Sequence, residues 1–219
     1  MDITVRRRLL ISVLLLGLAA VALPAGAAAA PSKCQRLKGR DRAPARTVKL
    51  VQRPNADDGT DLVGCVLPRG PLTVIASSAD FYTTVESYAI DRILGRIVVI
   101  ETTSSSQYAY TRALTVHDLR SRTAYTVARS CAMTGGGDCG IGGDSSAPAV
   151  LLTRAGRALA LVLHGGRATV TAFSTLGHAR PLDVGAPADI PPESLTLSGN
   201  LASWTNAGVP HSASLVGPG

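Results

Sequence analysis

The residues of this sequence that could do covalent chemistry gather in one glycine-rich segment, residues 142–148 (GGDSSAP). There a serine hydroxyl, Ser145, directly follows a carboxylate, Asp144. A serine attacks an acyl group when a base takes its proton and a carboxylate orients that base. The one histidine upstream is His117, so Ser145, His117 and Asp144 are the candidate set for a hydrolase.

The same segment resembles the Gly-Asp-Ser-Gly-Gly-Pro turn around the nucleophile of chymotrypsin-like proteases, and Cys139 precedes it. The resemblance implies that Ser145 would be the nucleophile. Ser146 and Ala147 replace the two glycines of that turn, and His117 lies in a strand-like segment instead of a small-residue turn. We therefore expect no catalytic residue, and a secreted hydrolase is the alternative.

A second cluster of polar residues, 55–61 (NADDGTD), could ligate a metal. Carboxylate oxygens suit Ca²⁺, which makes Asp57, Asp58 and Asp61 candidate ligands. The cluster lacks the register and the closing glutamate of an EF-hand, and Asn, Asp and Gly are also the usual residues of a hairpin turn. We expect a turn with no metal and no cofactor, and calcium is the alternative.

The first 30 residues have the pattern of an export signal. Three arginines precede an apolar run over residues 9–23, which ends at Pro24 and is followed by alanines. The run is shorter than the roughly 20 residues needed to cross a bilayer. We predict a cleaved signal peptide and a secreted protein. The alternative is a membrane anchor formed by an uncleaved segment 9–23.

The four cysteines, Cys34, Cys65, Cys131 and Cys139, all follow this signal. An even number in an exported chain indicates two disulfides, because the outside of the cell is oxidising. Three pairings are possible. We favour Cys34–Cys65 and Cys131–Cys139, since each closes a local loop.

The basic charge of the chain is unevenly spread. The whole sequence carries a net +7, yet residues 54–219 contain 11 arginines and 13 acidic residues, a net charge of −2. We predict a flexible basic arm over residues 31–46. Its basic residues are Lys33, Arg36, Lys38, Arg40, Arg42 and Arg46. The arm would contact an anionic envelope surface or serve as a solvated tether, and it has no aromatic residue to indicate nucleic acid.

Short apolar runs predict the elements that position these residues. The chain is 46% hydrophobic but only 4% aromatic, and runs such as residues 97–102 (IVVIET) and 158–163 (ALALVL) alternate with Gly-containing turns. β-Branched runs with turns every ~8–12 residues are typical of an all-β fold. We predict a single all-β domain over residues 47–219.

A weak repeat suggests how the strands are grouped. A strand, a turn at glycine and a more apolar strand recur around Gly95, Gly156 and Gly199. Gly156 and Gly199 are 43 residues apart, the length of one four-stranded propeller blade. The predicted blade units are residues 84–128, 149–185 and 194–216.

Several structural motifs follow the same pattern: residues 182–185 (LDVG), 190–195 (IPPESL), Gly199, Trp204 and Gly208. At these residues the chain resembles secreted bacterial proteins with β-propeller-like repeats, which implies a scaffold with no attached reaction. The strands suffice for about 3–3.5 four-stranded antiparallel blades, incomplete or closed by a second copy of the chain. A β-sandwich is the alternative.

From these features we expect a non-catalytic binding or scaffold module of the cell envelope or extracellular space. The sequence identifies no partner.

Overall fold

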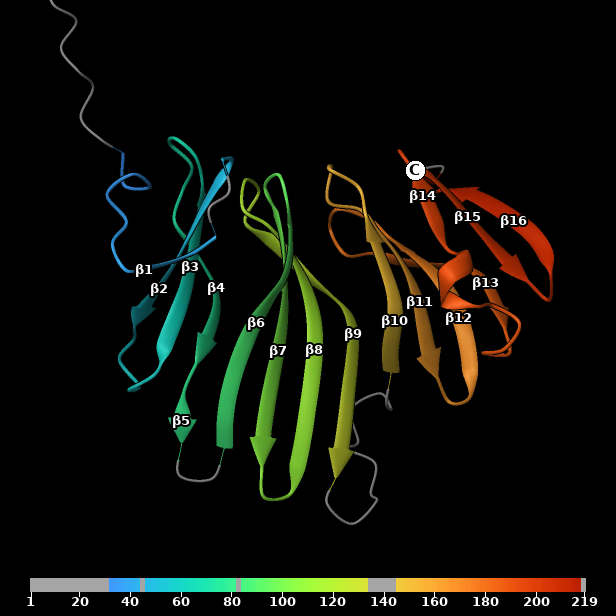
Figure 1. Cartoon of the computed structure of the whole chain (residues 1–219), viewed down its shortest axis with the longest axis horizontal. Coiled ribbons are helices and arrows are strands. Elements are labelled where there is room, and N and C mark those ends of the chain that lie inside the picture. Colours follow the sequence, from blue (N-terminus) through green and yellow to red (C-terminus); the bar gives the residue numbers. More distant parts are fainter. Residues whose placement is uncertain (1–31, 44–45, 82–83, 134–144, 218–219) are drawn as a thin grey trace, which may run out of the picture. The chain divides into compact units, whose positions relative to one another are not determined.

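Four antiparallel sheets follow one another along the chain in the computed structural model (Figure 1). The structure describes residues 32–43, 46–81, 84–133 and 145–217. Within these ranges the elements are strands and one short 3₁₀-helix, η1 (Pro192–Ser194). The predicted all-β fold is therefore confirmed.

The sheets contain four, five, four and three strands, each sheet being a simple meander apart from its bulges. The first has β1 (Arg40–Ala43), β2 (Val48–Pro54), β3 (Thr60–Val66) and β4 (Thr73–Ser78). The second has β5 (Asp80–Phe81), β6 (Thr84–Leu94), β7 (Ile97–Ser106), β8 (Ala109–Asp118) and β9 (Thr123–Met133). The third has β10 (Ser145–Leu152), β11 (Ala158–His164), β12 (Arg167–Phe173) and β13 (Ala179–Gly185). The fourth has β14 (Thr196–Ser198), β15 (Leu201–Asn206) and β16 (Val209–Ser214).

The sheets pack face to face, and the strand β7 shows why. Successive side chains of a strand point to opposite faces. Val98 and Ile100 therefore pack against the first sheet, whereas Ile97 and Val99 pack against the third. A strand that is buried on both faces has no polar side, which explains the unbroken apolar run at its start.

The strand β11 repeats this arrangement one sheet further along. Ala158 and Ala160 face the second sheet, and Leu159 and Leu161 belong to the core shared with the fourth. The four sheets thus form successive layers joined by apolar cores, as the blades of a propeller are. They are four separate sheets, in contrast to the two of a β-sandwich.

The sequence predicted about 3–3.5 blades, and the structure has four sheets. The units predicted at residues 84–128, 149–185 and 194–216 correspond to the second, third and fourth sheets. The strands expected before them form a complete sheet of their own, because β1 pairs with β2. The sequence of β1, RDRA, has no apolar alternation, so only its pairing with β2 makes it a strand.

The segment predicted to be a flexible arm is described over residues 32–43 and at Arg46. The predicted disulfide between Cys34 and Cys65 is present and buried. Leu37 packs beside it against Val51 and Val63, on the face of the first sheet that is turned away from the second. Residues 32–43 therefore form a cap on the first sheet.

Other predictions for the N-terminal half and the loops fall outside the described residues. The export signal at residues 1–30 and Cys139 belong to those segments. Cys131 is disulfide-bonded, and its pairing with Cys139 stays a prediction. The described part of the chain has no helix that is both long and apolar enough to span a membrane.

Polar bonds tie the turns of neighbouring sheets together at one edge, which we call the turn edge. Thr47 donates its hydroxyl to the carbonyl of Gly95, at 2.9 Å. The Tyr125 hydroxyl donates to the carbonyl of Gly156, also at 2.9 Å, while its ring stacks on Phe173. The connections β1–β2, β6–β7 and β10–β11 therefore lie along the same edge of the stack.

We predict that the core between the third and fourth sheets contributes strongly to stability. Leu161 is fully buried, so Leu161→Ala should lower the free energy of unfolding by about 2–5 kcal/mol. Leu201→Ala is the matched control, because Leu201 is 53% exposed on the outward face of the fourth sheet. Urea denaturation of both variants measures the difference, and equal losses would contradict the layered core.

Candidate functional site

A pocket of about 380 Å³ opens between the second and third sheets. The strands of the second sheet, β7–β9, are longer than those of the third and continue past the start of β10 (Figure 1). Side chains of the second sheet are therefore left uncovered there. The residues that line the pocket are Glu101, Arg112, Leu114, Ala128, Ser130, Ser145, Ser146, Ala147 and Pro148.

The floor of the pocket carries an ion pair. Glu101 on β7 lies opposite Leu114 on β8, and Arg112 is two residues before Leu114, so the register places both charged side chains on one face. Arg112 Nη2 lies 2.6 Å from Glu101 Oε2. The hydrogen bond to this carboxylate raises the pKa of Arg112.

Ser145, the candidate nucleophile, lines the pocket but has a structural role. Its hydroxyl donates to the carbonyl of Arg129 at 2.7 Å and accepts from the amide of the same residue at 3.2 Å. These two bonds join the start of β10 to β9 and hence the third sheet to the second. The hydroxyl proton is thus held by a backbone carbonyl, which is not a base that could remove it.

His117, the candidate base, lies on the opposite face of the second sheet. It pairs with Val98, whose side chain packs toward the first sheet, whereas Ser145 is on the side of the third. Burial lowers the pKa of His117 to about 4. Asp144 lies outside the described residues. The structure therefore does not bring Ser145 and His117 together as a catalytic pair.

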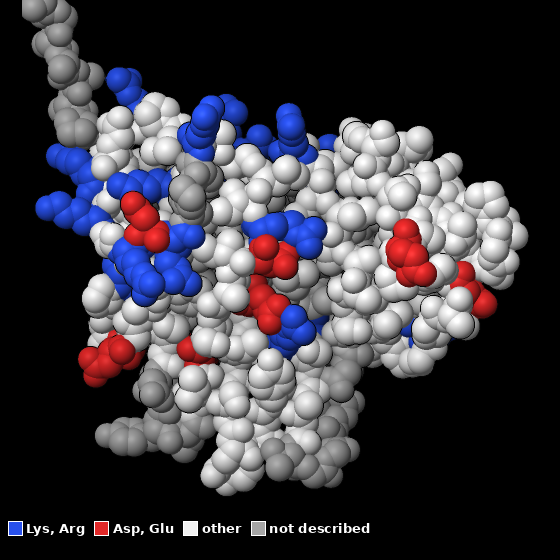
Figure 2. Space-filling view, in the orientation of Figure 1, with Lys and Arg blue, Asp and Glu red and all other residues white. Residues whose placement is uncertain are grey.

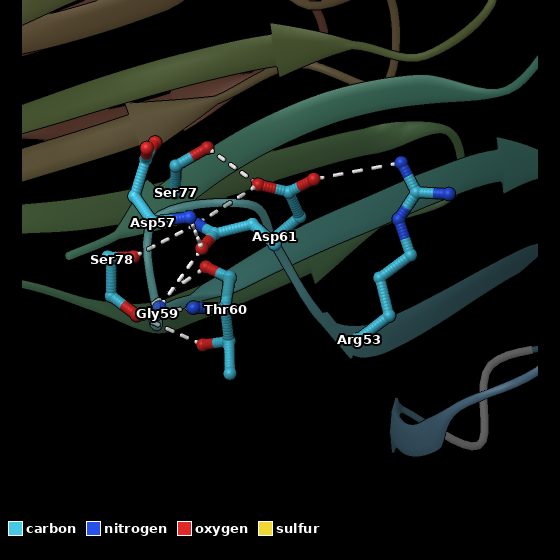
Figure 3. Close-up of polar contacts among 8 residues, drawn as sticks. Arg53, Asp57, Gly59, Thr60, Asp61, Ser77 and Ser78 are labelled. Atoms are coloured by element: carbon cyan, nitrogen blue, oxygen red, sulfur yellow. Dashed lines mark hydrogen bonds and ion pairs between the residues drawn. The ribbon is translucent and has the colours of Figure 1, made fainter.

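The candidate calcium ligands belong to the β2–β3 hairpin (Figure 3). The Asn55 side chain accepts hydrogen bonds from the amides of Asp57 and Gly59, at 3.0 and 2.9 Å, and so closes the turn. The Asp61 carboxylate accepts from the Ser77 hydroxyl at 2.9 Å and lies 3.5 Å from Arg53. Across the described ranges, three or more acidic, histidine or cysteine side chains are nowhere grouped to hold a metal.

The predicted basic residues are exposed on the cap and the turn that follows it. Lys33, Arg36, Lys38, Arg40 and Arg42 lie on the cap, and Arg46 lies on the connection to β2. The Ser32 hydroxyl donates to the carbonyl of Pro68, so the cap is beside the β3–β4 connection. The start of the cap therefore borders the turn edge, whereas Arg40 lies opposite Gln52, nearer the other end of β2.

The turn edge itself is rich in arginine. Its seven arginines, which we call the arginine edge, are Arg46, Arg69, Arg96, Arg120, Arg122, Arg154 and Arg157. In the described part of these connections the one carboxylate is Asp118, which pairs with Arg96 at 2.9 Å and accepts from the Arg120 amide. Figure 2 shows basic side chains along the upper border of the molecule, where these turns lie.

Sequence reasoning missed the arginine edge because its residues are far apart in the chain. One signal was available. In an antiparallel meander every second turn lies at the same edge. The turns after β6, β8 and β10 all carry arginine, so their alternation could have indicated a shared basic edge.

Comparison with known proteins adds no assignment to this geometry. No family model matches the chain, and no curated protein matches it. Any functional conclusion therefore depends on the pocket, the arginine edge and the residues around them.

We predict that Ser145 stabilises the junction of the second and third sheets and is not a nucleophile. Ser145→Ala should lower the free energy of unfolding by about 1 kcal/mol, because two backbone hydrogen bonds are lost. The exposed neighbour Ser146 is the matched control, and Ser146→Ala should have little effect. A fluorophosphonate probe should leave the protein unmodified, and labelling at Ser145 would contradict this role.

We also predict a stability loss in acid that depends on His117. Its pKa in the folded protein, about 4, is below the value of about 6.5 expected when unfolded. As the pH falls from 6.5 to 4 the unfolded chain gains a proton that the folded chain does not, so stability is full above this range and declines through it.

Denaturation midpoints measured from pH 7.5 down to pH 4 test this prediction. His117→Gln should show a smaller decline than the wild type. His178→Gln, a substitution on an exposed turn, should keep the wild-type profile. Identical profiles for wild type and His117→Gln would show that burial of this imidazole is not the cause.

Proposed function

We propose that this protein is a non-catalytic binding module of the cell envelope or extracellular space, which docks by its arginine edge on a phosphate-bearing polymer. The observation that carries the proposal is the collection of seven arginines, with a single carboxylate, on connections of three successive sheets. Five of them, Arg46, Arg69, Arg120, Arg122 and Arg154, are exposed.

The residue type supports phosphate as the recognised group. The described connections of the turn edge carry arginine and no lysine. A guanidinium group presents a planar set of N–H donors that matches the oxygens of a phosphate, whereas lysine offers a single point charge. A row of such groups along one edge suits a linear polyanion with repeated charges.

The distribution of charge supports binding at one edge over nonspecific electrostatic binding by the whole molecule. The net charge of residues 54–219 is −2, so basic character of the whole body does not explain the arginine edge. The connections at the opposite ends of the strands carry acidic residues, among them Asp57, Asp58, Asp189 and Glu193. A polyanion approaching the molecule is therefore attracted at one edge and repelled at the other.

The cap extends the arginine edge. The basic residues assigned from sequence to a flexible arm, such as Lys33, Arg36 and Lys38, are exposed on the cap, which begins beside the β3–β4 connection at Ser32. Because the disulfide between Cys34 and Cys65 holds this segment, its charges have a defined position. They add to the same surface.

An extracellular setting is part of the proposal. It is supported by the export pattern of residues 1–30 and by a disulfide, which persists in an oxidising compartment. The likeness to secreted bacterial propeller-like proteins stays a prediction, as does closure by a second copy. The outward face of the fourth sheet carries Ser203, Thr205 and Ser212 beside the exposed Leu201. The hydrolase alternative has no observation in its favour.

The test compares two variants with the same change in net charge. We expect Arg120→Gln/Arg122→Gln/Arg154→Gln to weaken binding of inorganic polyphosphate by about tenfold or more at low salt, because contacts to phosphate release counterions. The control, Arg53→Gln/Arg129→Gln/Arg167→Gln, removes three exposed arginines that lie away from the edge and should bind nearly as the wild type.

Fluorescence anisotropy over a salt series measures both affinities with the chain lacking residues 1–30. Equal weakening of the two variants would show that net charge alone drives binding and would refute the arginine edge. Vesicles containing phosphatidylglycerol provide a second arm. Tighter binding to vesicles than to polyphosphate would assign the edge to a membrane surface.

A further inference from the structure

The pocket between the second and third sheets has no part in the proposed function. It opens at the start of β10, whereas the arginine edge includes the turn at the end of that strand, which carries Arg154. We propose that this pocket binds a neutral saccharide. Its volume of about 380 Å³ lies within the usual range for small-molecule sites.

The positive and negative charges on the floor of the pocket balance each other, which favours a neutral ligand. Arg112 and Glu101 form an ion pair at 2.6 Å, so neither charge is left to attract an ion of opposite sign. The carboxylate still offers a free lone pair and the guanidinium still has N–H groups. An acceptor and a donor side by side match two adjacent hydroxyls of a sugar ring, each of which both donates and accepts.

A hydroxyl group adds a third polar contact. Ser130 on β9 pairs with Arg112 on β8, so its side chain is on the same face as the ion pair. Within the described part of the chain, the half-buried Ser130 hydroxyl has no hydrogen-bond partner. It is therefore available to a ligand in the pocket.

The apolar part of the lining suits the C–H faces of a sugar. Leu114 and Ala128 pair across β8 and β9 beside the ion pair, and Pro148 lies on the opposing strand at the bulge of β10. Beyond the lining itself, Tyr110 precedes Arg112 by two residues on the same face and is 44% exposed. An exposed tyrosine ring gives a rigid surface on which the ring of a sugar can stack.

Other ligand classes fit less well. A fatty chain would remove the ion pair from water and leave the Ser130 hydroxyl buried without a partner, both of which are unfavourable. A phosphate would meet the Glu101 carboxylate beside Arg112. A neutral polyhydroxylated ring satisfies the polar floor and covers the apolar wall at once.

The test uses a panel of neutral oligosaccharides, namely short fragments of glucan, mannan, galactan and chitin, with the chain lacking residues 1–30. Saturation-transfer NMR identifies a binder and calorimetric titration gives its Kd, which we expect at about 1 mM or tighter. Glu101→Gln and Tyr110→Ala should each weaken binding by about fivefold or more. Tyr108→Ala is the matched control, because Tyr108 is 67% exposed on the adjoining turn, outside the strand that carries Arg112 and Tyr110.

Three results would overturn the proposal: no panel member binds, the variants of Glu101 and Tyr110 bind as tightly as the wild type, or Tyr108→Ala weakens binding equally. Circular dichroism checks that each variant is folded, and Glu101→Asp is a milder second variant should Glu101→Gln unfold. The variant of Arg120, Arg122 and Arg154 should retain saccharide binding. Failure of this site and failure of the arginine edge are thereby distinguishable.

Discussion

Two-sided burial of the central strands β7 and β11 is the constraint on which the rest of this structure depends. Each strand is apolar at consecutive positions, so each needs a neighbouring sheet on both faces. Ile97 and Val98, adjacent in the chain, belong to different cores for this reason. A single neighbouring sheet could not bury both side chains. The stack of layers is the arrangement that removes the apolar surface on both faces of these strands from water.

Because of this stacking, the two ends of the strands form two different surfaces. At the turn edge, short connections from three sheets come together, and their arginines form one basic surface although residues 54–219 carry a net charge of −2. Toward the other end the second sheet continues beyond the third, and the pocket opens over the pair of Glu101 and Arg112. The meander topology therefore places the basic surface at one end of the strands and the pocket toward the other.

The alternation of side chains between the two faces of a strand explains why Ser145 and His117 form no active site. Ser145 and His117 are separated by only 27 positions, and spacing alone would allow them to meet. His117 shares a face with Val98, however, and that face looks toward the first sheet. A difference of one residue in register decides which face a side chain occupies. The Ser145 hydroxyl instead forms a hydrogen bond with the backbone of Arg129. No sequence motif distinguishes a serine in this structural role from a nucleophile.

The sequence by itself determined the all-β class, the spans of the apolar strands and the disulfide between Cys34 and Cys65, because alternation, turn residues and loop closure are local properties. Only the tertiary structure decided that the charged segment Arg40–Ala43 is a strand, that the basic arm is a cap and that distant arginines share an edge. These features arise from pairing and packing between segments far apart in the chain. Their free energy comes from the partner segment, and of the three only the arginine edge leaves a signal in the sequence, the arginines of alternate turns.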